Sequence, residues 1–141
     1  MNISKFTQKS VQAVQDLEKV AYQFGNQEIE EEHLLYALLE QEDSLILKLI
    51  EKMEINKEYF LNTVKNALDA KVKVSGGELR FGQYLNKALV NAEDEAKAMG
   101  DEYVSVEHLF LSLMKYPNTE IKKLFQAYGI TRERFLQALS T

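Results

Sequence analysis

The chain has 141 residues, a formal net charge of −5, no cysteine and a single proline. An acidic chain lacks the basic surface that phosphate binding needs, which excludes nucleic acid as a main partner. The missing cysteines exclude disulfides and thiolate metal sites and fit a reducing compartment, so we expect a cytoplasmic protein. No apolar run approaches the roughly 18 residues of a membrane span, and the N-terminus lacks the apolar stretch of a secretory signal, so we expect no membrane contact.

Four helices are predicted in the first half of the chain from its apolar periodicity and its capping residues. Gly25 follows the first helix as its natural end, because glycine adopts the left-handed conformation of a helix C-terminus at little cost. Ser44 and Asn56 precede the third and fourth helices, where a short polar side chain can accept a hydrogen bond from the first turn. The predicted ranges are Phe6–Phe24, about 31–40, Leu45–Lys52 and 57 to about 71.

The second half of the chain follows the same order after a linker at 72–79, whose Ser-Gly-Gly is the only linker-like composition in the sequence. Ser105, Thr119 and Thr131 are the predicted caps of its last three helices, and Pro117 marks a break between two of them. The predicted ranges of these three helices are Val106–Lys115, Glu120–Gln126 and Arg132–Leu139.

The two halves are related by an offset of 75 residues that needs no gap. The segment GNQEIEEEHLLYALLE at 25–40 matches GDEYVSVEHLFLSLMK at 100–115. Such a repeat indicates a duplicated unit that cannot bury its apolar face alone. We therefore expect an all-α fold in which two pseudo-symmetric four-helix repeats, at about 5–71 and 80–141, pack as one domain over 1–141.

The sequence shows no catalytic constellation. It contains no phosphate-binding GxxxxGK[ST] loop, no HExxH metal motif, no GxSxG elbow and no thiol nucleophile. His33 and His108 occupy equivalent repeat positions and have two interpretations: a shared metal site or pH switch, or imidazoles that each form hydrogen bonds near the start of a helix. We favour the second, because two histidines without further converging ligands bind metal weakly. We expect no catalytic residue and no metal site.

Positions that are apolar in only one repeat are not required by a shared core. Leu85 matches Ser10, and Tyr103 matches Glu28. These apolar side chains either line the seam between the repeats or form an exposed patch of the kind that binds unfolded segments. The acidic run at 28–32 also has two interpretations: negative charge that stabilises a helix N-terminus, or a rim that recognises basic or phosphorylated side chains.

The motifs around the two histidines resemble those of a known family. GNQEIEEEHLLYALLEQED and GDEYVSVEHLFLSLM resemble the duplicated Clp N-terminal repeat, and KFTQKSVQAV resembles the first helix of that family. The QEIE segment before His33, the QED after the second helix and the GDEYVSVEH segment are similar to the ClpB branch. The resemblance covers nearly the whole chain. It implies the mobile, substrate-engaging N-terminal domain of a hexameric AAA+ chaperone that threads aggregated proteins through a pore.

The resemblance also implies what the isolated domain lacks. ATP and magnesium would bind in ATPase modules that lie C-terminal to this segment, so the domain itself would have no cofactor and no enzymatic activity. Because the hexamer contacts of the family lie in those modules, the isolated domain would be a monomer. Its partners would be exposed apolar segments of unfolded or aggregated proteins, together with adaptor proteins.

Two sets of site residues follow for this function. Thr7, Asp101 and Glu107 match family positions implicated in activity, either through substrate contact or through the shape of the loop at 102–105, with Thr7 as a cap of the first helix. An apolar groove is predicted near that loop, and a core role stays open for those of its residues that have apolar repeat partners. The groove residues are Leu85, Leu89, Tyr103, Val104 and Phe110.

The alternative function comes from another branch of the same family. In ClpC-type relatives, glutamates just before the paired histidines recognise phosphorylated arginine as a degradation tag. Glu32 and Glu107 occupy those positions here. The alternative prediction is therefore a reader of phosphoarginine tags or adaptor proteins that serves a Clp protease.

Overall fold

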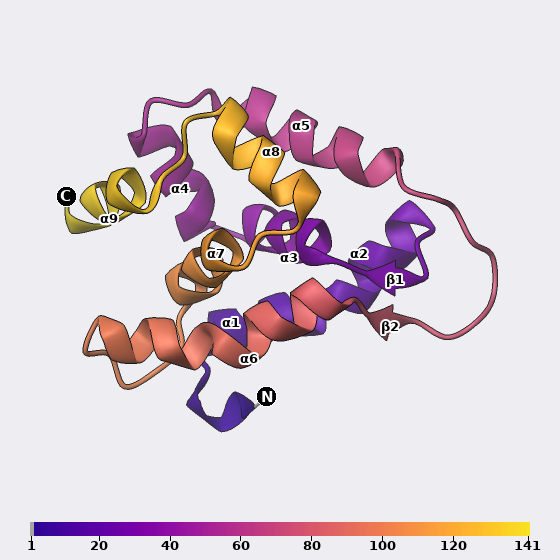
Figure 1. Ribbon diagram of the computed structural model, residues 1–141, viewed down its shortest axis with the longest axis horizontal. Coiled ribbons are helices and arrows are strands. Elements are labelled where there is room, and N and C mark those ends of the chain that lie inside the picture. The colour runs from indigo at the N-terminus through magenta and orange to yellow at the C-terminus, as the bar shows by residue number, and fades with distance from the viewer. Residues whose placement is uncertain (1) are drawn as a thin grey trace.

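The computed structural model describes residues 2–141, and nearly all of its regular structure is helical (Figure 1). This confirms the all-α prediction. In chain order the elements are η1 (Ile3–Lys5), α1 (Gln8–Gln15), α2 (Leu17–Phe24), β1 (Glu28–Ile29), α3 (Glu31–Leu39), α4 (Leu45–Lys52), α5 (Lys57–Asp69), β2 (Arg80–Phe81), α6 (Gln83–Ala98), α7 (Val106–Lys115), α8 (Thr119–Ala127) and α9 (Arg132–Ser140).

Three of the predicted helix caps are confirmed by hydrogen bonds. Ser44 Oγ accepts from the Leu47 N–H at 3.1 Å, and Asn56 Oδ1 accepts from the Tyr59 N–H at 3.0 Å. Thr131 Oγ1 caps α9 in the same way. Each cap satisfies a first-turn N–H that has no partner inside its own helix.

Two local predictions are wrong. The first helix does not run unbroken from Phe6 to Phe24, because it begins at Gln8 and is interrupted at Asp16. Thr119 does not cap α8 but is its first residue. Asn118 is the cap instead, with its Oδ1 accepting from the Ile121 N–H at 2.9 Å.

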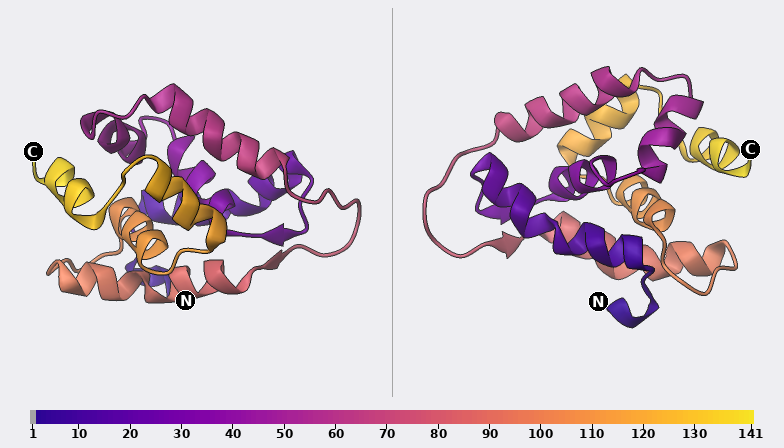
Figure 2. Two further views of the ribbon diagram at one scale, coloured as in Figure 1. Left: turned by 45° about the horizontal axis from the view of Figure 1, so that its top comes forward. Right: turned by 180° about the vertical axis from the view of Figure 1, so that it is seen from behind.

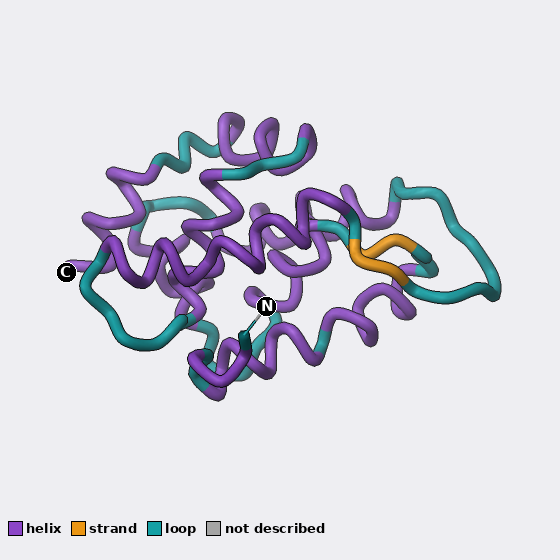
Figure 3. Tube along the Cα trace, turned by 60° about the horizontal axis from the view of Figure 1, so that its bottom comes forward, coloured by secondary structure: helices purple, strands orange, loops and turns teal. Residues whose placement is uncertain are grey.

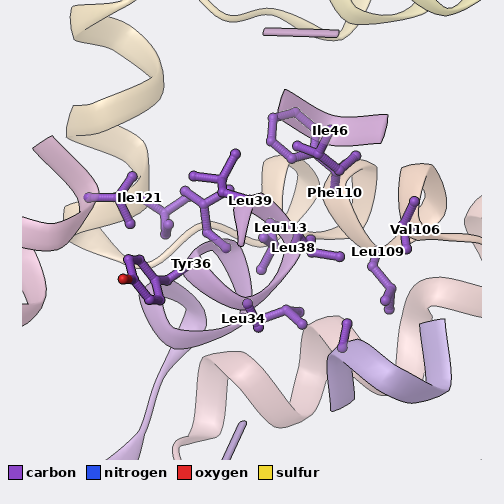
Figure 4. Packing of buried hydrophobic residues seen from close by; sticks show 14 of the residues in the cluster. Leu34, Tyr36, Leu38, Leu39, Ile46, Val106, Leu109, Phe110, Leu113 and Ile121 are labelled. Carbon is purple, nitrogen blue, oxygen red and sulfur yellow. The ribbon is translucent and has the colours of Figure 1, made fainter. Parts of the chain in front are cut away.

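The helices form layers around two central ones. Seen from several sides, α3 and α7 lie between a layer of α1, α2 and α6 and a layer of α4, α5, α8 and α9 (Figure 2). All nine residues of α3 are buried. Leucines of α3 and α7 meet in the middle of the core, where Figure 4 labels Leu34, Leu38, Leu109 and Leu113. Within the described residues, no helix is long and apolar enough to cross a membrane.

The two repeats are interleaved, because elements of one repeat contact elements of the other. Helix α4 of the first repeat contacts α9 of the second, and α8 of the second contacts α5 of the first. Strand β1 of the first repeat pairs in parallel with β2, which opens the second repeat. The reciprocal contact is a parallel bridge between Phe6 and Val104. These strand contacts were not predicted from the sequence.

Candidate functional site

The exchanged strand contacts create two equivalent junctions between the repeats. We call the contact of residues 5–7 with 101–105 the N-terminal junction, and the contact of residues 80–82 with 27–30 the linker junction. Figure 3 shows the strands of the linker junction beside the long linker loop. In the N-terminal junction the Thr7 N–H donates to Val104 O at 3.0 Å, and in the linker junction the Gly82 N–H donates to Ile29 O at 2.8 Å. Because Thr7 and Gly82 are 75 residues apart, as are Ile29 and Val104, the two bonds are repeat equivalents.

A buried histidine of the following helix forms hydrogen bonds to each junction loop. His108 Nδ1 accepts from the Ser105 N–H at 2.8 Å, and its Nε2 lies 2.8 Å from Asp101 Oδ2. His33 Nδ1 accepts from the Glu30 N–H at 2.8 Å, and its Nε2 lies 3.0 Å from Asn26 Oδ1. Because Nδ1 is an acceptor in both rings, we assign the proton to Nε2, which then donates to Asn26 or Asp101.

These bonds confirm the prediction that each imidazole is bound locally near the start of its helix. Burial lowers the pKa of His33 from its ordinary value of 6.5 to about 4, which outweighs the opposing effect of the nearby Glu32 carboxylate. Among the described residues, no group of three or more histidine, aspartate or glutamate side chains is arranged to hold a metal ion.

The N-terminal junction contains four of the predicted site residues, Thr7, Asp101, Tyr103 and Val104, and a fifth, Glu107, follows it in α7. Thr7 caps α1, because its Oγ1 accepts from the Ser10 N–H at 3.3 Å. Asp101 is exposed except for its contact with the buried histidine, and Glu107 is partly exposed in the first turn of α7. Tyr103 projects from the loop with 51% of its surface exposed.

The predicted apolar groove is corrected by the structure. Leu85, Leu89, Val104 and Phe110 are each no more than 2% exposed and belong to the core, so they cannot form the wall of an open groove. The reason is the close packing of α6 against α7, and Phe110 also stacks on Phe135 with ring centroids 4.6 Å apart. Of the five groove residues, Tyr103 alone is exposed.

A cluster of buried carboxylates at the start of α3 was not predicted. Glu31 Oε1 accepts from the Asn118 N–H at 2.6 Å, and Glu32 Oε1 accepts from Asn118 Nδ2 at 2.6 Å. Lys71 Nζ lies 2.5 Å from Glu32 Oε2 and 2.6 Å from Glu30 Oε2. The cluster thus joins the start of α3, the second residue after α5 and the cap of α8. The repeat equivalent of Glu31 is the apolar Val106, which was a sequence signal that this position is buried.

Burial has opposite consequences for two members of the cluster. It raises the pKa of Glu31 to about 8, although the hydrogen bond from Asn118 favours the charged form, because Glu31 Oε2 is enclosed without a hydrogen-bond partner among the described residues. Burial lowers the pKa of Lys71, but the hydrogen bonds and charges of Glu30 and Glu32 outweigh it, and the pKa of Lys71 lies above its ordinary value.

The structure does not favour the alternative site at Glu32 and Glu107. The Glu32 carboxylate is 2% exposed and is already bound by Lys71 and Asn118. Glu107 is partly exposed and lacks any such partner among the described residues. The two positions are therefore equivalent in sequence but not in chemistry.

The family model described as the Clp repeat (R) N-terminal domain matches residues 5–128. Chaperone protein ClpB of Nitratidesulfovibrio vulgaris is 37% identical over 145 residues, which cover 99% of this chain and 17% of that protein. Chaperone protein ClpB of Clostridium tetani is 38% identical over 144 residues, with the same coverage. The chain thus spans 17% of the length of these relatives.

Solved structures share the fold at lower identity. The Hsp104 N-terminal domain of Candida albicans has a TM-score of 0.81 and 22% identity, covering 96% of this chain and 89% of that one. The N-terminal domain of the ClpV1 ATPase of E. coli has a TM-score of 0.79 and 21% identity, covering 98% and 85%. With the family model and the ClpB relatives, these likenesses show that the chain belongs to the Clp repeat N-terminal domain family.

Proposed function

We propose that this domain engages exposed apolar segments of unfolded or aggregated proteins on behalf of an ATP-dependent disaggregase, without catalysis of its own. The observation that carries the proposal is the likeness to ClpB chaperones over 99% of the chain. In the whole protein, ATP and magnesium would be bound by ATPase modules outside this segment. The same modules would assemble six subunits in the cytoplasm.

We assign the substrate contact to the N-terminal junction. Tyr103 offers an exposed aromatic ring on a loop that hydrogen bonds to Thr7 and His108 hold in place. A ring on a fixed loop loses little conformational entropy when it binds a partner. Asp101 and Glu107 flank Tyr103 in the sequence and are exposed and partly exposed, so apolar segments that also carry basic residues fit this surface best.

A contact built around one exposed ring is small, which predicts weak and reversible binding with a dissociation constant on the order of micromolar or higher. Such affinity suits a domain that must release its client to a threading pore. A solved complex of a ClpV N-domain with a VipB peptide has a TM-score of 0.72 to this chain at 20% identity, covering 98% of this chain and 89% of that one. It supports a peptide segment, from a client or an adaptor, as the class of ligand.

The test is an NMR titration of the isotope-labelled domain with a reduced, alkylated and permanently unfolded protein. We expect shifts at residues 101–107, and Tyr103→Glu should weaken binding about tenfold because it replaces the central aromatic contact by a charge. Tyr59→Glu, at an exposed tyrosine on α5, is the matched control and should change nothing. Binding that survives Tyr103→Glu unchanged would remove the site, and an absence of shifts at millimolar protein would remove the function. Shifts at Glu32 and Glu107 with free phosphoarginine would instead support the tag reader.

A further inference from the structure

The two phenylalanines that open the repeats are equivalent in sequence but differ in exposure. Phe6 is 7% exposed, and its N–H donates to Ile3 O at 3.0 Å within the turn formed by η1. Phe81 is 39% exposed. The repeat equivalent of Ile3 is Glu78, which lies in the linker and forms no turn over Phe81. At the same place in the fold, the first repeat covers its strand edge with its own chain and the second does not.

The directions of the N–H and C=O groups of β2 show which of them face away from β1. The N–H groups of Arg80 and Gly82 both point toward β1, where they donate to Gln27 O at 3.1 Å and to Ile29 O at 2.8 Å. Because successive residues of a strand direct their N–H and C=O groups to opposite edges, those of Phe81 point away from β1. Within residues 2–141, no hydrogen bond to another residue occupies the Phe81 N–H.

We propose that this free edge of β2 at Phe81 pairs with an extended, apolar segment of an unfolded protein, which adds to β1 and β2 as a third strand. The proposal rests on the proposed function and gives it a second contact surface, apart from the N-terminal junction. Addition of a strand to an exposed sheet edge uses main-chain hydrogen bonds for affinity and side-chain contacts for selection.

The surroundings of Phe81 favour an apolar segment over a polar one. Among residues 2–141, four of the ten exposed large apolar side chains lie between residues 72 and 84: Val72, Val74, Phe81 and Tyr84. The Val74 N–H donates to Gly25 O at 2.9 Å, which holds this part of the linker against the loop before β1.

Main-chain pairing also fits the diversity of the substrate. Every residue except proline presents the same N–H and C=O groups, so an edge of this kind accepts many sequences. The strand is two residues long, which keeps the added interface small and its binding weak. A short edge is also a poor template for lasting pairing between two copies of this domain.

The test separates main-chain pairing from apolar contact. The probes are a ten-residue peptide of alternating valine and threonine with one central lysine, and the same peptide N-methylated at alternate residues in either of the two registers. N-methylation in the register that faces β2 removes the pairing N–H groups but keeps every side chain. We expect that peptide to bind the wild-type domain about tenfold more weakly than the unmodified one, with NMR shifts of the unmodified peptide centred on residues 79–84.

Variants of the domain provide the matched comparison. Phe81→Pro removes the outward N–H without breaking the bonds of Arg80 and Gly82 to β1, and proline is tolerated on such an edge. Phe81→Val keeps the N–H but loses the ring. We expect Phe81→Pro to weaken peptide binding about as much as N-methylation, roughly tenfold, and Phe81→Val to weaken it less. A folded spectrum of each variant is the control for structure.

Three outcomes would overturn the inference. One is equal binding of both N-methylated peptides and the unmodified peptide to the wild-type domain, a result that needs no variant to fold. Another is peptide shifts confined to residues 101–107, which would keep the proposed function and discard this edge. The third is concentration-dependent self-association of the domain that Phe81→Pro abolishes, which would assign the edge to a second copy of the chain. If the wild-type domain bound unfolded protein at neither junction, that result would instead contradict the proposed function itself.

Discussion

The N-terminal junction and the linker junction have the same backbone plan and different surfaces. Each joins the segment that opens one repeat to the loop before α3 or α7 of the other, and each contacts a buried histidine of that helix. Yet Thr7 caps its helix with a side chain where Gly82 has none, and Phe6 is buried where Phe81 is exposed. Backbone hydrogen bonds thus preserve the scaffold, while side-chain differences leave a different aromatic residue exposed at each junction, Tyr103 or Phe81.

The supports of the two junctions differ as well. Asn26, the partner of His33, is buried, whereas Asp101, the partner of His108, is exposed to solvent. The first repeat also carries the buried carboxylates of Glu31 and Glu32, where the second has Val106 and Glu107. The buried polar interactions are therefore concentrated in the first repeat. Substituting a residue there should destabilise the domain more than substituting its repeat equivalent in the second repeat.

The largest effect is expected from removing the two histidines one at a time. His33→Ala would leave a cavity and bury Asn26 and the Glu30 N–H without their partner, which should destabilise the fold by about 3 kcal/mol. His108→Ala should destabilise it by about 2 kcal/mol, because Asp101 can turn to water. Urea unfolding of both variants measures the difference. An equal loss, or a larger loss for His108→Ala, would contradict the asymmetry between the junctions.

The pH dependence of stability should belong to the first repeat. The folded pKa of Glu31, about 8, lies above its ordinary 4.5, so the folded protein keeps a proton that the unfolded chain releases, and stability falls as the pH rises between these values. The folded pKa of His33, about 4, lies below its ordinary 6.5, so the unfolded chain takes up a proton that the folded protein does not, and stability falls as the pH drops from 6.5 to 4.

Between pH 4.5 and 6.5 the two effects on stability oppose each other, and above pH 6.5 the effect of Glu31 dominates. We expect the wild-type domain to lose about 2 kcal/mol of stability between pH 6.5 and 8. Glu31→Gln should abolish that loss and expose the contribution of His33 below pH 6.5. Urea unfolding at several pH values measures both slopes. If Glu31→Gln retained the loss above pH 6.5, the buried carboxyl would not be its source.

Much of the fold could be predicted from local patterns, because apolar periodicity and capping residues act within one helix. Ser44, Asn56 and Thr131 cap as expected. The strands could not be predicted, since two-residue strands show no alternation of apolar and polar residues. The cap of α8 was misassigned because Asn118 and Thr119 are both suitable residues. Long-range hydrogen bonds from the start of α3 to Asn118 decide between them.

The candidate site was less predictable, because exposure depends on packing between helices. Leu85 and Tyr103 are both apolar in one repeat only, yet the first is buried and the second half exposed. The sequence pattern is the same for a seam and for a surface patch, so it could not separate them. Glu31 and Glu32 resemble an exposed acidic run, and only the Val106 equivalent of Glu31 indicated a buried position.

The smallest effect concerns the cap that the carboxylate cluster holds. Asn118→Ala removes the α8 cap and leaves Glu32 Oε1 without its amide donor, so we expect a loss of about 1.5 kcal/mol in urea unfolding. Its repeat equivalent, Asp43, is an exposed residue that pairs with Lys48 and caps no helix. Asp43→Asn tolerates the positive φ of 57° at that position and should leave stability nearly unchanged. If the two variants lost equal stability, Asn118 would contribute no more than an exposed surface residue. The hydrogen bonds that join it to Glu31 and Glu32 would then not stabilise the fold.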